Sequence, residues 1–228
     1  MKSYKQFIKE SEVLSKTDKD FIHSKLYHKI IFHGISNNYT INPDGSIDVD
    51  DNVSFDPSRS SSTKLRYKPS KKNKLTELPI KFNKVGGNFY CNDNELTTLE
   101  GAPKEVGGDF DCHNNQLTSL VGCPEVIGGN INCRFNKITD FKGVSEFFEG
   151  LFYCEGNPIE EIYTLFLQED SINDSKCIKW INEFDVIQGN KVIMDRLEEV
   201  FHQLGMDIPQ SVVNIGLKNL TFKNYEII

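Results

Sequence analysis

Four successive rows of 21 residues decide the fold: KKNKLTELPIKFNKVGGNFYC (71–91), NDNELTTLEGAPKEVGGDFDC (92–112), HNNQLTSLVGCPEVIGGNINC (113–133) and RFNKITDFKGVSEFFEGLFYC (134–154). Residues of the same chemistry recur in the same columns. The columns hold Asn at 73, 94, 115, 136 and 157, Cys at 91, 112, 133 and 154, Phe or Ile at 89, 110, 131 and 152, and Gly-Gly at 86/87, 107/108 and 128/129. A unit this short cannot bury its apolar side alone, so we expect the units to stack and share one core.

The residues before each cysteine alternate as in a strand, where successive side chains point to opposite sides. The alternation predicts that Phe110 and Cys112 point inward. Their outward neighbours are Asp109, Asp111 and His113. Each column Asn then turns the chain inward, and its amide can satisfy backbone groups of neighbouring units, which predicts an asparagine ladder. The Gly-Gly pair permits either positive φ or close approach between units.

The order F-x-C-x-x-N-x-L-x-x-L over residues 110–120 resembles the leucine-rich repeat pattern L-x-L-x-x-N-x-L, with Phe and Cys in two Leu positions. One departure is that the family's first Leu position falls on glycine, so we expect the convex side to be packed by Val85, Val106 and Ile127. The short unit and its prolines at 79, 103 and 124 are similar to bacterial and viral repeats. The resemblance implies a curved solenoid of about five coils with a parallel sheet on its concave side.

The outward positions of the strands differ from unit to unit although their inward neighbours are repeated. We call these positions the outward row: Asn88, Tyr90, Asn92, Asp109, Asp111, His113, Asn130, Asn132, Arg134, Leu151, Tyr153 and Glu155. A uniform scaffold with varied outward residues is typical of a recognition surface, and Tyr and Arg are common at binding hot spots. The predicted partner-binding residues are Tyr90, Asn92, Asp111, His113, Asn132, Arg134, Tyr153 and Glu155. The alternative is a hydrophilic face without a partner.

The six cysteines indicate packing rather than chemistry. Ligands of structural zinc come in close sequence pairs, whereas these cysteines line up one per unit, so we expect no metal and no cofactor. Cys123 on the convex arc could be reactive, with ordinary packing as the alternative. Some bacterial repeat proteins of this kind carry a ubiquitin-ligase domain with a Cys-x-Asp nucleophile, but Cys177 is followed by Ile178 and Lys179. We therefore expect no enzyme activity.

Charge is divided unevenly before the repeats: residues 40–56 hold five acids and no base, and residues 57–76 hold seven bases and no acid. One interpretation of the stretch NPDGSIDVDD (42–51) is a calcium-binding loop. Its flanks alternate like strands, which favours a β-hairpin around Pro43-Asp44-Gly45 that caps the first coil. The basic run from Arg59 to Lys74 indicates a flexible loop, with phosphate contacts as the alternative.

Both ends of the chain show helical periodicity. Residues 17–31 predict a helix with one apolar face made by Phe21, Ile22, Leu26, Ile30 and Ile31. After the repeats, two apolar stripes are separated by Gly189-Asn190. The stripes are Ile178, Ile181 and Phe184, and Ile193, Leu197, Val200, Phe201 and Leu204. We expect Trp180 to help seal these helices over the last coil, and residues 219–228, with Leu220 and Phe222 alternating, to form a short strand.

Composition limits the setting in which the chain works. It has 228 residues and a net charge of -7, which opposes attraction to nucleic acid or anionic lipid. It has no apolar run near the ~18 residues of a spanning helix and no secretory signal, so we expect it in a reducing compartment and not secreted. The start MKSYKQFIKE resembles the capsid-targeting peptides of T-even-type phage head proteins, which are cut after a motif matched here by Ile8-Lys9-Glu10. The V-G-G-D-F-x-C repeat also resembles repeat proteins of large tailed phages. These resemblances imply a phage protein located in a host cytoplasm or a virion.

The predicted fold class is α/β, a leucine-rich-repeat solenoid with an N-terminal helix and β-hairpin cap and a C-terminal helical cap. Residues 1–35 form the N-terminal helical segment, with 1–10 as the targeting peptide. Residues 36–70 form the hairpin cap and basic loop, 71–162 the leucine-rich repeats, and 163–228 the helical cap. The expected function is non-catalytic binding of a host or phage protein on the concave strands. A virion-packaged internal head or architectural protein is the alternative, and a ubiquitin-ligase-type enzyme is a remote one.

Overall fold

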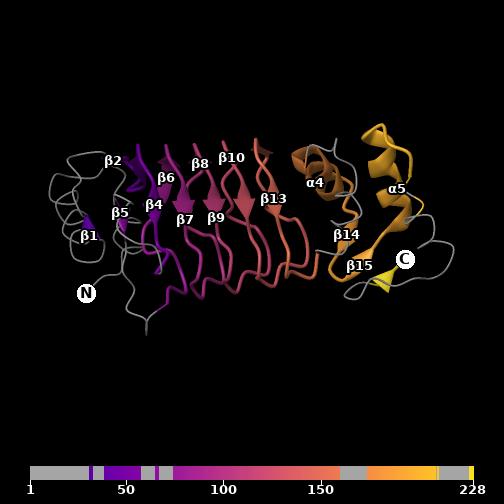
Figure 1. Ribbon diagram of the computed structural model, residues 1–228, viewed down its shortest axis with the longest axis horizontal. Coiled ribbons are helices and arrows are strands. Elements are labelled where there is room, and N and C mark those ends of the chain that lie inside the picture. Colours follow the sequence, from indigo (N-terminus) through magenta and orange to yellow (C-terminus); the bar gives the residue numbers. More distant parts are fainter. Residues whose placement is uncertain are drawn as a thin grey trace.

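The computed structural model describes residues 31–32, 39–57, 65–66, 74–159, 174–208, 210 and 226–228. The chain is a mixed α/β protein with two large, mainly parallel sheets. Two helices are bounded within the described residues, α4 (Asp174–Glu183) and α5 (Met194–Gln203). Figure 1 shows the strands of the repeat units side by side along the longest axis, with both helices beyond β13. Units 1 to 4 are residues 71–91, 92–112, 113–133 and 134–154.

One strand from each unit joins a seven-stranded sheet of order β1-β5-β4-β7-β9-β11-β13. Its strands are β1 (Ile31–Phe32), β5 (Leu65–Arg66), β4 (Val53–Ser54), β7 (Phe89–Tyr90), β9 (Phe110–Asp111), β11 (Ile131–Asn132) and β13 (Phe152–Tyr153). Every pairing from β5 to β13 is parallel, whereas β1 pairs antiparallel with β5. Phe89, Phe110, Ile131 and Phe152 lie opposite one another, which confirms the parallel pairing of successive units.

Each unit also supplies a second strand, which the sequence analysis did not predict. The second sheet has six strands in the order β12-β10-β8-β6-β3-β2. Its strands are β12 (Phe147–Phe148), β10 (Val126–Ile127), β8 (Glu105–Val106), β6 (Phe82–Val85), β3 (Ile47–Val49) and β2 (Tyr39–Ile41). Val85, Val106 and Ile127 point inward from this sheet and are buried, as predicted. Strands of two residues are too short to show alternation in a sequence.

The predicted hairpin is confirmed, because β2 and β3 pair antiparallel with Ile41 opposite Ile47. Strand β3 then pairs in parallel with β6, so the hairpin continues the second sheet beyond unit 1. The Asp44 carboxylate accepts hydrogen bonds from the backbone N–H of Ser46 (3.0 Å) and from the Nζ of Lys81 (2.9 Å). These bonds fix the turn and tie it to unit 1.

The inward side chains of the units form one continuous core. Cys91, Cys112, Cys133 and Cys154 are each 1% exposed or less, and they lie beside the column of Phe and Ile side chains. The rings of Phe89 and Phe110 stack with centroids 5.8 Å apart. The inward orientation predicted for Phe110 and Cys112 is therefore confirmed.

The asparagine ladder is confirmed in full for the described units. The Nδ2 of Asn115 donates to the carbonyl oxygens of Cys91 (3.1 Å) and Cys112 (3.0 Å). Its Oδ1 accepts the backbone N–H of Leu96 (2.9 Å), so one side chain joins two units. Equivalent bonds are made by Asn94, Asn136 and Asn157.

The Gly-Gly pairs serve close approach between units, not positive φ. A Cβ at Gly128 would lie 2.5 Å from the carbonyl oxygen of Gly107, a distance that a real side chain does not adopt. Unit 4 has Glu149 at this position. Its backbone N–H still donates to the carbonyl oxygen of Ile127 (N···O 3.2 Å), as that of Gly128 donates to Val106 (2.9 Å).

Two expectations for the N-terminal part need correction. Ile31 lies in β1, although the periodicity predicted a helix there, and the rest of that helix falls outside the described residues. Leu65 and Arg66 form β5, so the basic run is not a loop throughout. Both strands join an existing sheet, and that tertiary pairing outweighs the local pattern. The rest of the basic run up to residue 73, and Ile8 and Glu10, lie outside the described residues.

The C-terminal part has the two predicted apolar stripes. Ile178 and Ile181 of α4 and Leu197, Val200 and Phe201 of α5 are buried. Gly189-Asn190 lies between β14 (Ile187–Gln188) and β15 (Lys191–Val192), a hairpin that the sequence analysis did not predict. Strand β16 (Glu226–Ile227) pairs with β15. The predicted tail strand is thus confirmed only at these two residues, since Leu220 and Phe222 are outside the described part of the chain.

Candidate functional site

The outward row divides into three columns, and the first of them is structural. Its side-chain oxygens accept the backbone N–H of the same position in the next unit: Asn88 from Asp109 (2.7 Å), and Asp109 from Asn130 (2.8 Å). Asn52 before the repeats takes the same role for Asn88. This second polar ladder was missed, because Asn and Asp alternate in a column that otherwise resembles varied surface. It ends at Leu151, whose side chain has no acceptor.

The predicted exposure of the remaining row is wrong for its first part. Tyr90, Asn92 and Asp111 are only 8%, 3% and 9% exposed. Parallel strands lie about 4.8 Å apart, so side chains of neighbouring units cover one another. Within its own unit, Tyr90 also accepts a hydrogen bond on its hydroxyl from the Nδ2 of Asn88. Of the other predicted residues, His113, Asn132, Arg134 and Tyr153 are half-buried and Glu155 is exposed.

The middle of the row holds a histidine between two carboxylates. The Nδ1 of His113 lies 2.6 Å from Oδ1 of Asp111, and its Nε2 lies 3.6 Å from Oδ2 of Asp93. Because a carboxylate can only accept, Nδ1 carries the ring proton. Asp93 also accepts from the Nδ2 atoms of Asn114 (2.6 Å) and Asn92 (2.7 Å). The cluster is rich in acceptors and therefore suited to a cationic or donor group.

Asn92 adds an unusual feature beside this cluster. Its Nδ2 is used by Asp93, while its buried Oδ1 has no hydrogen-bond partner among the described residues. An unsatisfied buried acceptor costs about 1 to 3 kcal/mol. A buried polar atom without a partner is commonly explained by a bound ligand or an ordered water.

The last two units form an arginine-centred cluster. The Nη2 of Arg134 donates to Oε1 of Glu155 (3.0 Å), and its Nε donates to Oε2 of the same carboxylate. The guanidinium also lies 4.2 Å from the ring centroid of Tyr153. The hydrogen bond to Glu155 raises the pKa of Arg134 and lowers the pKa of Glu155. Arg134 is thereby held in one geometry.

Phe135 belongs to this surface but was missed by the sequence analysis. It is 60% exposed and has a φ of 54°. A bulky residue in the left-handed region costs roughly 1 to 2 kcal/mol. The column could have revealed it, because the equivalent positions hold Asp93, Asn114 and Gly156, residues that tolerate this conformation.

The six cysteines are buried or, at Cys123, half-buried. Cys112 is fully buried, and strand alternation turns its neighbour His113 to the other side. Burial raises the pKa of the half-buried Cys123 thiol to about 12, which favours the packing interpretation of this residue. Cys177 is also fully buried. The described residues contain no group of three or more His, Cys, Asp or Glu side chains that could hold a metal ion.

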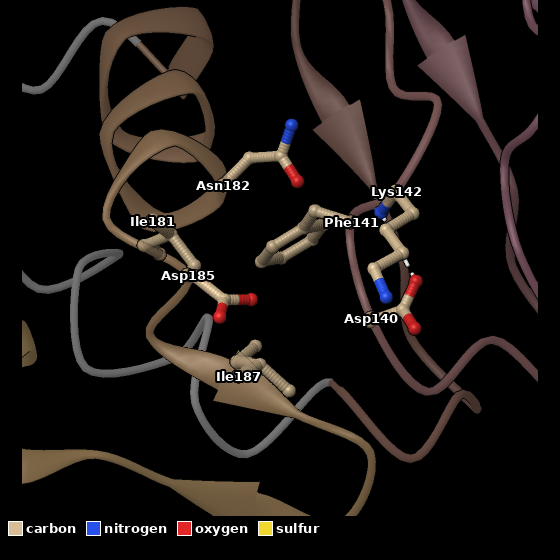
Figure 2. Close-up of a pocket in the computed structure, with 7 residues that line it drawn as sticks. All are labelled: Asp140, Phe141, Lys142, Ile181, Asn182, Asp185 and Ile187. Carbon is tan, nitrogen blue, oxygen red and sulfur yellow. Dashed lines mark hydrogen bonds between the residues drawn. The ribbon is translucent and has the colours of Figure 1, made fainter.

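Hollows elsewhere are poor alternatives to the row. Figure 2 shows the junction where the Phe141 ring points from unit 4 towards α4, facing Ile181 and Ile187. Its volume of about 10 Å³ leaves room for roughly one water molecule. A larger groove of about 250 Å³ has small residues in its lining, including Gly101, Ala102 and Cys123, together with three acids and two bases.

Comparisons with protein-family models, with curated proteins and with solved structures gave no match for this chain. Within the part of the chain that the structure describes, no helix is long and apolar enough to cross a membrane. The outward row is therefore the candidate functional site.

Proposed function

We propose that the chain is a non-catalytic binding module, built as a leucine-rich-repeat solenoid, that recognises a protein partner on the concave face of its seven-stranded sheet. The observation that carries the proposal is the contrast between repeated buried side chains and a varied outward row. The accessible residues of that row include the half-buried Arg134 and Tyr153 and the exposed Glu155, of which Tyr and Arg are hot-spot types.

The geometry favours the C-terminal half of the row as the main contact. Tyr90, Asn92 and Asp111 are covered by their neighbours, whereas Arg134 and Glu155 keep 33% and 48% of their side-chain surface exposed. The pair is held bidentately and stacked on Tyr153, so little side-chain entropy remains to be lost on binding.

The test compares a triple variant of the row with a double control variant on the exposed surface. In one, Arg134, Tyr153 and Glu155 are all changed to Ala. In the control, the exposed residues Glu146 and Glu198 are changed to Ala. Exposed ion pairs and cation–π contacts contribute about 1 kcal/mol or less each, so both variants should fold. Proteins that the wild type captures from infected cells should bind the first variant at least tenfold more weakly. Their affinity for the control variant should be unchanged. Equal capture by both variants would move the site away from the row.

A phage-encoded protein packaged in the virion is the second candidate, favoured by the Ile8-Lys9-Glu10 motif and the repeat type. In that role, contacts would use the ends of the molecule rather than the concave face. Mass spectrometry of purified particles should then detect a chain that begins at Ser11. If the chain is found only in infected cells, with Met1 intact, packaging by this route would be excluded.

A further inference from the structure

We infer that Phe135 is the anchor of the proposed interface, and that its ring enters an apolar pocket on the partner protein. The rim of that pocket carries a hydrogen-bond acceptor, which Arg134 binds. The inference rests on the proposed function and adds to it the residue on which the affinity depends most.

The backbone conformation of Phe135 is imposed by the repeat. Its N–H donates to the carbonyl oxygen of Glu155 (2.9 Å), as the equivalent N–H groups of the units before it donate to the following unit. The φ angle is positive throughout this column, at 59° in Asp93, 54° in Asn114 and Phe135, and 74° in Gly156. Every side chain in the column must therefore accept the left-handed region, which suits Asp, Asn and Gly but not Phe.

Phe135 gains little within the chain in return for this strain. The Nδ2 of Asn114 donates to Oδ1 of Asp93 (2.6 Å), whereas a phenyl ring can make no such link to its column neighbour. The ring lies over Gly156, since a Cβ there would be 2.6 Å from Cδ1 of the ring, yet Phe135 stays 60% exposed. Strained residues of this kind gather at functional sites, and contact with a partner accounts for a Phe here.

The surroundings of the ring favour a pocket as its occupant. The adjacent residues in the chain and in the next unit are polar or glycine, namely Arg134, Asn136, Glu155 and Gly156. A broad apolar face would bury these polar groups without partners, whereas a pocket of the size of one ring leaves them at its rim. The net charge of -7 opposes nucleic acid and anionic lipid, so the fitting partner is a protein.

Arg134 lies next to the anchor and offers a polar contact. Its Nε and Nη2 donate to Glu155, while Nη1 makes no hydrogen bond to the described residues. The guanidinium is held in place by Glu155 and by the ring of Tyr153, so Nη1 can donate to an acceptor on the partner with little further loss of entropy.

The first half of the experiment measures stability. The variant Phe135→Asn copies Asn114 of the same column and relieves the strain, so its melting temperature should rise by about 2 to 4 °C. The matched control Phe135→Leu keeps an apolar side chain on the same strained backbone, and its melting temperature should stay near that of the wild type.

The second half measures binding by the whole chain. A protein that the wild type captures from infected cells is identified by mass spectrometry and purified, and its affinity for each variant is measured by calorimetry. Phe135→Asn should bind this protein at least tenfold more weakly although it is the more stable variant. Phe135→Leu should lose less affinity than Phe135→Asn, because it still fills part of an apolar pocket.

The outcomes separate this inference from the proposed function. Unchanged affinity for Phe135→Asn, together with a loss in the triple variant of Arg134, Tyr153 and Glu155, overturns the inference alone. Equal binding of all variants, or capture of no protein, counts against both. A lower melting temperature for Phe135→Asn shows that the ring stabilises the fold and overturns the inference. Wild-type dimers in light scattering that dissociate in Phe135→Asn identify a second copy as the occupant and also overturn it.

Discussion

The asparagine ladder gives the most direct test of how the units are held together. Changing Asn115 to Ala removes the acceptor for the buried N–H of Leu96 and two bonds donated to the carbonyls of Cys91 and Cys112. These carbonyls keep a second donor, Asn94 for Cys91 and Asn136 for Cys112, so each lost bond costs about 0.5 to 1 kcal/mol.

The orphaned N–H of Leu96 contributes the larger part, about 1 to 3 kcal/mol. The sum is about 3 kcal/mol, or a fall of roughly 6 to 12 °C in melting temperature for a chain of this size. Urea unfolding followed by circular dichroism measures the loss, with the exposed neighbour Gln116→Ala as the matched control.

A second substitution separates hydrogen bonding from filling of space. Asn115→Leu fills the site with an apolar side chain but still leaves the N–H of Leu96 without an acceptor, so its loss should remain near that of Asn115→Ala. Full stability in Asn115→Leu, or a loss below about 1 kcal/mol in Asn115→Ala, would refute the view that this side chain works by satisfying the backbone.

Two further predictions concern titratable groups. Desolvation by burial raises the pKa of the Cys91, Cys112 and Cys133 thiols well above the ordinary value. A thiol reagent at pH 8 should therefore label them only after denaturant is added. Rapid labelling in the folded chain would contradict this packing. The hydrogen bond from Ser46 and the contact with Lys81 lower the pKa of Asp44 from 3.8 to about 2. The contribution of Asp44 to stability is therefore present above pH 3.8 and lost as the pH falls towards 2. The variant Ser46→Ala should reduce the difference in unfolding free energy between pH 6 and pH 2. An unchanged difference would contradict a stabilising role for this hydrogen bond.

The repeated columns of the sequence predicted those structural features that depend on the same residue at the same position of each unit. The inward Cys112 and Phe110, the ladder at Asn115 and the parallel register between units all follow from this regularity. The second sheet was missed because pairs such as Glu105–Val106 are too short to show a period. The hairpin of β14 and β15 was missed because Gly189 between two helical stripes was interpreted only as a break.

The candidate surface was predicted less well than the core. Outward orientation was assigned from alternation, but exposure depends on the sizes of neighbouring side chains, which alternation does not contain. Tyr90 is therefore covered although it points outward. Phe135 lies just after the strand, where alternation ends, and only its departure from Asp93, Asn114 and Gly156 marks it.

The spacing between units also has an evolutionary consequence. Gly107 and Gly128 meet the same backbone atoms in the unit before them, and Asp109 and Asn130 accept the same N–H from the unit after them. An in-frame genetic duplication of residues 92–112 would therefore reproduce contacts that already exist, and recombination can lengthen the molecule in steps of 21 residues. Addition of a unit after unit 4 is different, because the side chain of Leu151 has no oxygen to accept a backbone N–H from the added unit. Related genes should thus vary in the number of internal units while keeping the same final one.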